Sequence, residues 1–358
     1  MNKIFFGVDW ILLLGAVLLV VFGLSAIYSL EPFFFRQQII FLLIGIFLYW
    51  FVARLYVPKI NTIWIVLYVI MNLSLIAILF FGVEVKGAVR WIEILGIRIQ
   101  ISEFIKILYI LFLSWFLTQN DKHSLEKFIG ALVLSAPIGF LILREPDLGN
   151  ALIVGFLTIL MLFVYGFPMR YFIIMFTAVG VLIPIVFEFL HDYQRARITS
   201  FLNMSQDPFG SSYNAIQSLI AIGSGGVFGK GFGQSTQSLL HFLPEQHTDF
   251  IFATILESLG LVGGIVLLIL YSVIFLRIYK HAVDSTGVFG RLVLFGSFFL
   301  ILIHVLFNMG MNIGILPIVG VTLPFVSYGG SSLITNFILL GIVSNLSSRR
   351  SSKLLEIR

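Results

Sequence analysis

Residues 10–28 of this chain read WILLLGAVLLVVFGLSAIY, an apolar run without a single charged residue. A helix needs about 20 such residues to cross the hydrocarbon core of a bilayer, so this stretch predicts a membrane-spanning helix. The run is too long for the core of a signal peptide, and no small-residue cleavage site follows it. We therefore expect a retained membrane anchor.

The rest of the chain has the same character. It is 59% hydrophobic and only 11% charged, whereas soluble proteins carry about 25% charged residues. Apolar runs of near-spanning length fall at residues 10–29, 36–53, 60–83, 102–118, 128–143, 148–166, 171–190, 250–276, 292–312 and 332–346. The alternation typical of a membrane β-barrel is absent. We predict an all-α polytopic membrane protein of about ten transmembrane helices, forming a single integral domain over residues 1–358.

The basic residues predict the orientation. With both termini in the cytoplasm, thirteen of the 22 Lys and Arg residues lie on the inner side, as the positive-inside rule requires. The protein is thus expected to be a multi-pass protein of the cytoplasmic (inner) membrane, with an inner C-terminal tail at about residues 347–358. The outer cations need another explanation, and an anionic external ligand is the simplest one.

Charge and cysteine content exclude several classes of protein. The net charge of +5 is scattered between apolar runs, so we expect no nucleic-acid partner. The absence of cysteine excludes disulfides, thiolate nucleophiles and cysteine-ligated metals.

One long polar connection, at about residues 191–248, is expected to be an external loop between helices 7 and 8 and to be functional. Within it, residues 213–222 have the spacing of a short helix on the membrane surface. Arg195 and Arg197 suit a diphosphate, although ordinary solvation of a loop explains them as well. The glycines of residues 223–233 lack the Walker A pattern, so they indicate a flexible approach for a bulky ligand or a plain turn, and not a nucleotide site.

Two shorter segments carry buried charge. Residues 87–106 enter a helix for which Ser102 is the expected N-cap, with Glu103 and Lys106 one turn apart. This pair either neutralises itself or lines a cavity, since ionisable groups at membrane depth are costly. In residues 144–149, Pro146 is expected to begin a helix with Asp147 in its first turn, a position that equally suits a structural role.

The strongest local pattern is FLPEQHTDFIF at residues 242–252. Asp249 falls where the polar loop becomes an apolar helix, so its carboxylate suits a general base or a metal ligand. A helix cap with a first-turn charge is the alternative, and His247 is more often a packed residue than a ligand. Residues 312–332 hold two prolines and several glycines, which predicts a re-entrant wall of a cavity.

These motifs together resemble the SEDS family of cell-wall enzymes. The resemblance is carried by GAVRWIEILGIRIQISEFIK, EPDLGNA, the segments RITSFLN and GSGGVFGKG, FLPEQHTDFIFA and LPIVGVTLPFVSYGGSS, over residues 87–332. It departs at Gln100-Ile101 and at Glu145, where the family usually has Gln-Pro and Gln. The branch typified by RodA is closer than the one typified by FtsW.

The resemblance implies a peptidoglycan glycosyltransferase that polymerises lipid II on the outer face of the membrane, for cell elongation and shape. It implies lipid II and the growing glycan strand as substrates, and a class B penicillin-binding protein, a single-pass transpeptidase, as partner. It assigns the essential carboxylate to Asp249, with a divalent ion (Mg²⁺ or Mn²⁺) compatible and no organic cofactor. The other site residues that it implies, or that the outer charges suggest, are Glu103, Lys106, Arg90, Trp91, Ser327, Arg195 and Arg197. A lipid II flippase and a non-catalytic scaffold for the transpeptidase are the alternatives.

Overall fold

The computed structural model describes residues 8–55, 61–85, 88–94, 96–119, 123–188, 195, 201, 212–240 and 242–355. Within these residues lie ten long helices, one for each expected run: α1 (Trp10–Leu30), α2 (Pro32–Val52), α3 (Asn61–Phe81), α4 (Ile101–Thr118), α5 (Leu125–Arg144), α6 (Leu148–Tyr165), α7 (Met169–Glu188), α11 (Ile251–Asp284), α12 (Val288–Asn312) and α13 (Gly330–Leu355). Nine of these helices are long and apolar enough to cross a membrane, and α7 has a shorter apolar part, Met169–Leu182. The all-α polytopic fold is confirmed.

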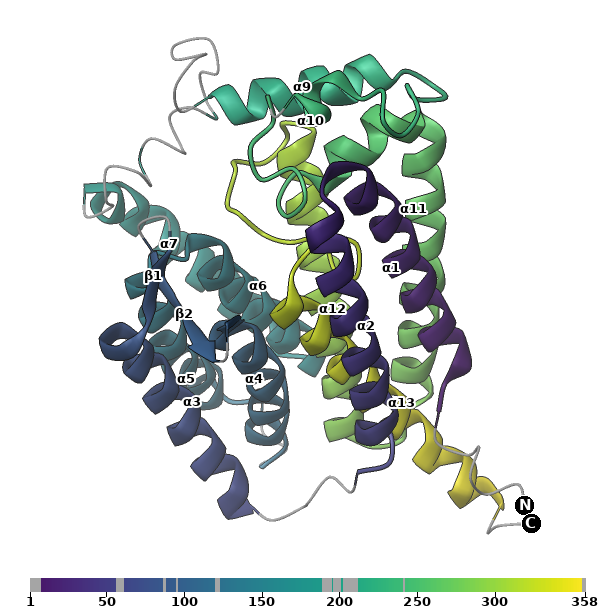
Figure 1. The fold of residues 1–358 in the computed structure, drawn as a ribbon. Coiled ribbons are helices and arrows are strands. Elements are labelled where there is room, and N and C mark those ends of the chain that lie inside the picture. Colours follow the sequence, from purple (N-terminus) through teal and green to yellow (C-terminus); the bar gives the residue numbers. More distant parts are fainter. Residues whose placement is uncertain are drawn as a thin grey trace.

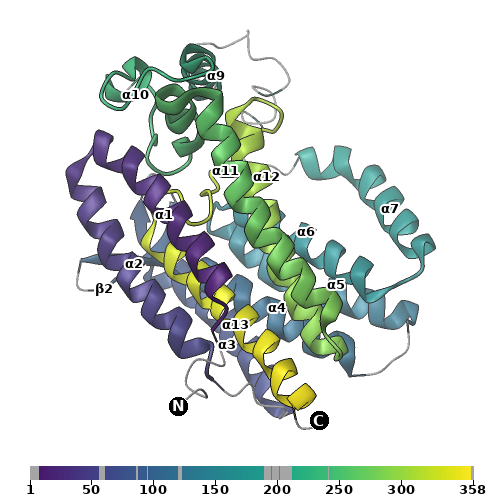
Figure 2. The ribbon, with the colours of Figure 1, turned by 90° about the vertical axis from the view of Figure 1, so that its right-hand side faces the viewer.

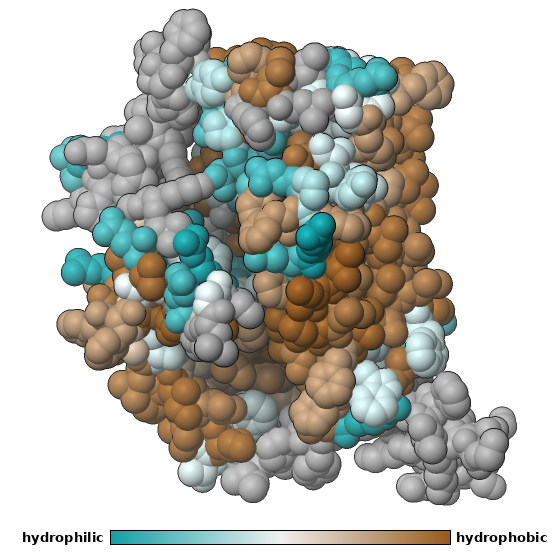
Figure 3. Space-filling view, viewed as in Figure 1, coloured by the Kyte–Doolittle hydropathy of each residue, from teal (hydrophilic) through white to brown (hydrophobic). Residues whose placement is uncertain are grey.

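The surface of the bundle fits a lipid environment. Large apolar side chains such as Phe47, Phe163 and Leu276 are more than half exposed on outward helix faces. Figure 3 shows hydrophobic residues over the helices and hydrophilic residues gathered toward one end of the molecule. A bilayer removes such outward apolar surface from water, so no second protein layer is needed there.

Two short helices lie in the long connection between α7 and α11. The helix expected at residues 213–222 is confirmed as α9 (Tyr213–Gly225), and α10 (Thr236–Leu239) follows it. Figure 1 shows α9 lying across one end of the bundle, above α11 and α12.

A three-stranded antiparallel sheet was not predicted. It consists of β1 (Val83–Val85), β2 (Ala88–Ile94) and β3 (Ile97–Gln100) in the order β1-β2-β3. Trp91 pairs with Gln100 and Ile92 with Ile99. The β-branched residues that alternate with polar ones in this segment favour strands, a local signal that charge and turn residues obscured. The sheet leads directly into α4, so Arg90 and Trp91 stand beside the start of that helix.

Two helix starts differ from the predicted ones. Gln100 is the N-cap residue of α4, and Ser102 lies inside the helix with its side chain fully buried. The final strand runs straight into the helix, so the boundary falls earlier than the serine. Likewise, α6 begins at Leu148 with Asp147 as its N-cap, whose Oδ1 accepts from the Asn150 amide. Pro146 therefore lies in the turn and does not begin the helix. In addition, α13 continues to Leu355, into the segment predicted as a tail.

Helix α11 is broken at Gly260, where φ is +63°. A loop from the α9–α10 connection supplies hydrogen-bond partners at the break: the Leu261 amide donates to the Gly226 carbonyl at 3.0 Å, and the Lys230 amide donates to the Glu257 carbonyl at 3.0 Å. Such a break is tolerated because protein backbone satisfies the freed groups. It ties the external connection firmly to α11.

The start of α1 and the C-terminal half of α13 meet at the same end of the bundle. The Asp9 amide donates to Ser344 Oγ at 2.7 Å, and the Asp9 carboxylate lies 2.7 Å from Arg277 Nε and 2.6 Å from His281 Nε2 of α11. Figure 2 shows α1, α11 and α13 running side by side toward this end. The opposite end of the bundle holds the starts of α2, α4, α6, α11 and α13, which lie around one cavity.

Candidate functional site

A cavity of about 600 Å³ lies among the beginnings of these five helices. Its lining comes from segments far apart in the sequence: Phe33, Phe34, Gln37, Phe41, Arg90, Trp91, Glu93, Gly96, Arg98, Gln100, Glu103, Asn150, Glu245, His247, Thr248, Asp249, His304, Gly320, Val321, Thr322, Tyr328, Gly329, Gly330, Ser331 and Ser332. Asp249, Glu103, Arg90 and Trp91, four of the predicted site residues, are thus brought together. The predicted cavity wall at residues 312–332 also lines it.

The N-terminal ends of α2, α4, α6 and α13 contribute to this lining, and so does the turn before α11. Each helix N-terminus carries a partial positive charge of about half a unit from its unpaired amides. Arg90 and Arg98 of the sheet add two formal positive charges, and the same lining contains the acidic residues Glu93, Glu103, Glu245 and Asp249. Phosphate groups are the usual ligands of helix N-termini, so an anionic group would bind beside these ends and the arginines and away from the acidic side chains.

Asp249 is half-buried in the turn that precedes α11. Its backbone carbonyl accepts hydrogen bonds from Asn308 Nδ2 and Asn312 Nδ2, both at 2.9 Å. A Cβ atom on Gly320 would lie 3.4 Å from Asp249 Oδ2, so the opposite wall approaches the carboxylate closely. The alternative of a charge in the first helical turn is wrong, because the helix begins only at Ile251 and the carboxylate lines the cavity.

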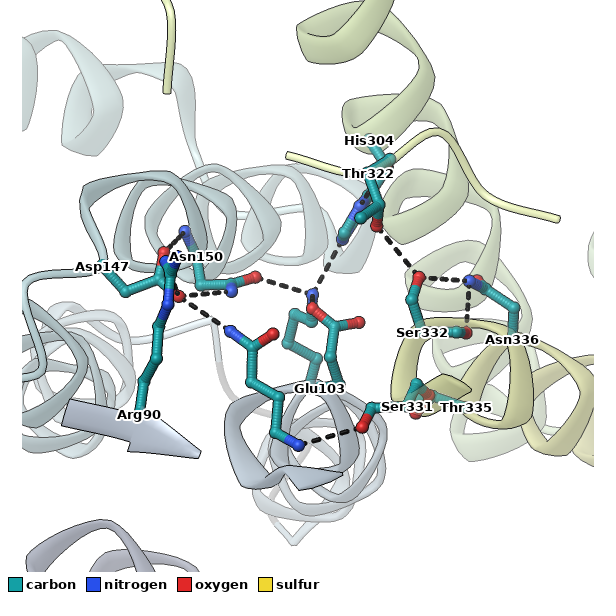
Figure 4. A network of polar contacts seen from close by, with 12 residues as sticks. Arg90, Glu103, Asp147, Asn150, His304, Thr322, Ser331, Ser332, Thr335 and Asn336 are labelled. Carbon is teal, nitrogen blue, oxygen red and sulfur yellow. Dashed lines mark hydrogen bonds and ion pairs between the residues drawn. The ribbon is translucent and has the colours of Figure 1, made fainter. Parts of the chain in front are cut away.

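A polar network connects several residues of the lining (Figure 4). Asp147 Oδ2 accepts from Gln100 Nε2 at 2.9 Å and from Asn150 Nδ2 at 2.8 Å, and lies 3.5 Å from Arg90 Nη1. On the other side of α4, the Gln100 amide donates to Ser331 Oγ at 2.9 Å. The network joins the sheet, α4, α6 and α13, which fixes the cavity floor.

Lys106 occupies the centre of this network and is only 1% exposed. Its Nζ lies 2.7 Å from Glu103 Oε1, 2.7 Å from Asn150 Oδ1 and 2.9 Å from His304 Nε2. An ammonium group has three donors, so all three are committed. The predicted Glu103–Lys106 ion pair is confirmed, and it lies at the cavity, where Glu103 is part of the lining.

Arg90 is placed differently. Its side chain is 29% exposed, and its buried Nε has no hydrogen-bond partner within the protein. A guanidinium offers five donors in a planar fork that matches phosphate oxygens. The exposed part of the Arg90 side chain lines the cavity, whereas the unpartnered Nε is buried.

Glu145 is a buried carboxyl in the turn between α5 and α6, and neither of its oxygens has a hydrogen-bond partner within the protein. Burial, reinforced by the charge of Asp147 and partly opposed by Arg90, raises the pKa of Glu145 to about 8. The group is therefore protonated at neutral pH and adds no charge to the site.

The remaining predicted residues lie outside the lining. Ser327 is buried, donates to the Thr248 carbonyl at 2.6 Å and accepts from the Leu323 amide at 2.8 Å, so it braces the turn before Asp249. The Arg195 guanidinium donates to the Glu188 carbonyl at the end of α7. Arg197 lies outside the described residues. Direct substrate contacts of these three residues stay predictions.

A metal site formed by the protein alone is not supported in the described part of the chain. There, no three His, Asp or Glu side chains gather closely enough to hold an ion. A divalent ion bound through Asp249 would thus need other ligands from the substrate, as Mg²⁺ commonly takes from phosphates. Metal binding by Asp249 stays a prediction.

Several residues of the site were missed from the sequence. His304, Asn308 and Asn312 follow one another at intervals of four in α12, which places them on one helix face. Polar residues at that spacing inside an apolar run mark a buried functional face, a signal that the sequence contains. Phe34 stacks on His247 with ring centroids 4.4 Å apart, and no local pattern indicates that contact.

Comparison with known proteins agrees with the predicted resemblance. The family model of FtsW, RodA and SpoVE, described as cell cycle protein, matches residues 3–352. The peptidoglycan glycosyltransferase MrdB of Escherichia coli K12 is 43% identical over 286 residues, which cover 79% of this chain and 77% of that protein.

Solved structures also share the fold. A peptidoglycan synthase complex that coordinates polymerization and crosslinking contains a chain with a TM-score of 0.83 and 28% identity, covering 96% of this chain and 98% of that one. The rod shape determining protein RodA of Thermus thermophilus has a TM-score of 0.71 and 27% identity, covering 95% and 96%. The predicted resemblance to RodA is confirmed. The chain belongs to the FtsW, RodA and SpoVE family of cell cycle proteins, the SEDS family.

Proposed function

We propose that this chain is a peptidoglycan glycosyltransferase that polymerises lipid II in the cavity beside Asp249. The observation that carries the proposal is the juxtaposition in one cavity of a carboxylate, Asp249, with two arginines and the N-terminal ends of four helices. A carboxylate can take the proton of an attacking hydroxyl group, and the arginines and helix N-termini suit a diphosphate. The relationship to MrdB supports the same activity.

The chemistry needs little more than these groups. A hydroxyl of the acceptor sugar attacks the anomeric carbon of the donor, the bond from that carbon to the lipid diphosphate breaks, and Asp249 takes the hydroxyl proton. Lipid diphosphate is already a good leaving group, so a protein general acid is not required, unlike in glycoside hydrolases with their carboxyl pairs. Negative charge develops on the departing diphosphate, and preorganised donors are most effective there.

We assign the diphosphate to Arg90 and the helix N-termini first. The Arg90 side chain is 29% exposed and lines the cavity, whereas Lys106 is buried and fully bonded and acts by holding Glu103, Asn150 and His304 in place. Arg195 and Arg197 are proposed to contribute from the external connection. The apolar outer faces of the helices would hold the polyprenyl tail.

The orientation follows from the charge count. With the Asp9 end of the bundle in the cytoplasm, the positive-inside rule is obeyed and the cavity opens near the outer face. Both termini are then cytoplasmic, in the inner membrane. The structural relationship to a synthase complex supports a single-pass class B penicillin-binding protein as partner.

Reconstitution tests this function against its alternatives. The purified protein, with and without the cognate transpeptidase, is incubated in liposomes with labelled lipid II. Glycan polymer supports the polymerase, whereas transfer of label across the bilayer without polymer supports a flippase. Recruitment of the transpeptidase with neither activity supports a scaffold.

The Asp249→Asn variant tests the base. Asparagine keeps the size of the side chain and the backbone contacts to Asn308 and Asn312, so the variant should fold, while loss of a general base should lower turnover about 10²- to 10⁴-fold. Glu126→Gln removes the same charge from an exposed site in the first turn of α5 and serves as the control. Undiminished polymerisation by Asp249→Asn would contradict the assignment.

A further inference from the structure

Helix α9 reaches the backbone of Asp249 through a chain of hydrogen bonds. Ser218, fully buried in α9, donates from Oγ to the backbone carbonyl of Asn312 at 2.8 Å and lies 3.4 Å from its Oδ1. Asn312 in turn donates from Nδ2 to the Asp249 carbonyl at 2.9 Å. Only one residue, at the end of α12, thus separates the external helix from the proposed base.

Asn312 also caps the helix that follows Asp249. Its Oδ1 accepts from the Ala253 amide at 3.1 Å, and Ala253 is in the first turn of α11, where amides have no partner within the helix. Its Nδ2 donates to the Asn308 carbonyl at 2.8 Å as well. Asn308 holds the Asp249 carbonyl from a second direction and the Val321 carbonyl of the opposite wall at 2.7 Å. A shift of Asn312 therefore moves the turn that carries the carboxylate.

The outer side of α9 is accessible. Leu219 and Ile220, which follow Ser218 directly, are 38% and 44% exposed. At its C-terminal end the helix lies against the backbone of α11, because a Cβ atom on Gly225 would stand 1.9 Å from the Leu256 carbonyl oxygen. α9 thus connects an apolar external surface to the two helices whose ends hold Asp249, as its position in Figure 1 indicates.

We propose that Asn312 is a positioning residue that couples α9 to the orientation of Asp249, so that turnover depends on the Ser218 hydroxyl that holds Asn312. The proposal rests on the proposed role of Asp249 as base. The coupling is a free energy between Ser218 and the turn that carries Asp249. Misplacement of a reacting group by about 1 Å can lower a rate about 100-fold, so a small shift suffices.

Ser218→Ala is the informative variant. It removes only the hydroxyl that reaches Asn312, and alanine favours a helix, so the protein should stay folded. Ser224→Ala is the matched control, because Ser224 lies on the same helix and donates only to the Ala221 carbonyl of α9, at 2.9 Å. Both variants are assayed for lipid II polymerisation, with kcat and KM determined separately and with melting temperature as a check on folding.

We expect Ser218→Ala to lower kcat about 2- to 30-fold while KM stays within about twofold, as for residues that carry coupling between sites. Ser224→Ala should match the unaltered protein. Asn312→Ala should lower kcat further, and its melting temperature shows whether lost capping of α11 contributes. Equal kcat in Ser218→Ala and Ser224→Ala, or a rise in KM alone, would overturn the coupling. Full activity of Asp249→Asn would instead overturn the proposed function, so the two failures are distinguishable.

Discussion

Replacing Lys106 by methionine separates an electrostatic role from substrate binding. Methionine keeps most of the length of the side chain but removes a buried charge that pairs with Glu103 at 2.7 Å. Because Glu103 is only 6% exposed, its carboxylate would be left uncompensated in a low-dielectric site. Breaking a buried ion pair from one side costs about 3–5 kcal/mol of folding free energy. We therefore expect a clear loss of thermal stability in detergent.

The double variant Lys106→Met with Glu103→Gln removes both charges. It should recover most of the lost stability, since a neutral pair carries no uncompensated charge. Melting temperature and lipid II polymerisation are measured for the two single variants and the double variant. Normal stability of the Lys106→Met variant would refute the inference that the lysine holds the site together. A double variant that is stable but inactive would show that the charges of Glu103 and Lys106 serve turnover as well as stability.

Three further predictions concern single positions. Gly320→Ala should destabilise the protein by about 1 kcal/mol, because φ at this position is +68°. It should also lower polymerisation, because the added Cβ atom would lie 3.4 Å from Asp249 Oδ2. Unchanged turnover would contradict the second effect. Glu145→Gln should raise the melting temperature at pH 7 but not at pH 4. The pKa of Glu145 is raised from its usual value of 4.5 to about 8, so the folded protein loses stability as the pH rises from 4.5 toward 8, and glutamine removes that loss. An effect of the substitution that does not depend on pH would exclude this cause. Burial opposes ionisation of Asp9, but the hydrogen bonds from His281 and Arg277 prevail and lower its pKa from 3.8 to about 2. Asp9→Asn should therefore lower the free energy of unfolding by about 2 kcal/mol at neutral pH, and by less as the pH falls from 4 to 2. Denaturation at several pH values measures this difference.

The site could be predicted only in part. Asp249 stands out because a carboxylate occurs where a polar loop turns into an apolar helix, and Glu103 and Lys106 because charge is rare inside an apolar run. The same reasoning applies to His304, Asn308 and Asn312, whose four-residue spacing was available but unused. The strand alternation of residues 88–94 was likewise present, yet three short strands between helices give a weak signal.

Other features have no local signal at all. Lys106 and Arg90 carry the same charge, but Lys106 is buried and fully bonded and Arg90 is partly exposed at the cavity, and only their neighbours in space decide that difference. Ser327 was predicted as a site residue, whereas its contacts brace the Thr248 turn.

The sequence by itself determined the membrane-spanning helices, because hydropathy over about 20 residues is a local property and the bilayer allows such a segment only one backbone form. It also determined the family, through motifs whose order is preserved along the chain. Only the tertiary structure decided that the starts of five helices surround one cavity, and that Asn312 joins α9 to Asp249. Those contacts link residues separated by tens to hundreds of positions, and packing of the whole bundle, which no short segment encodes, brings them together.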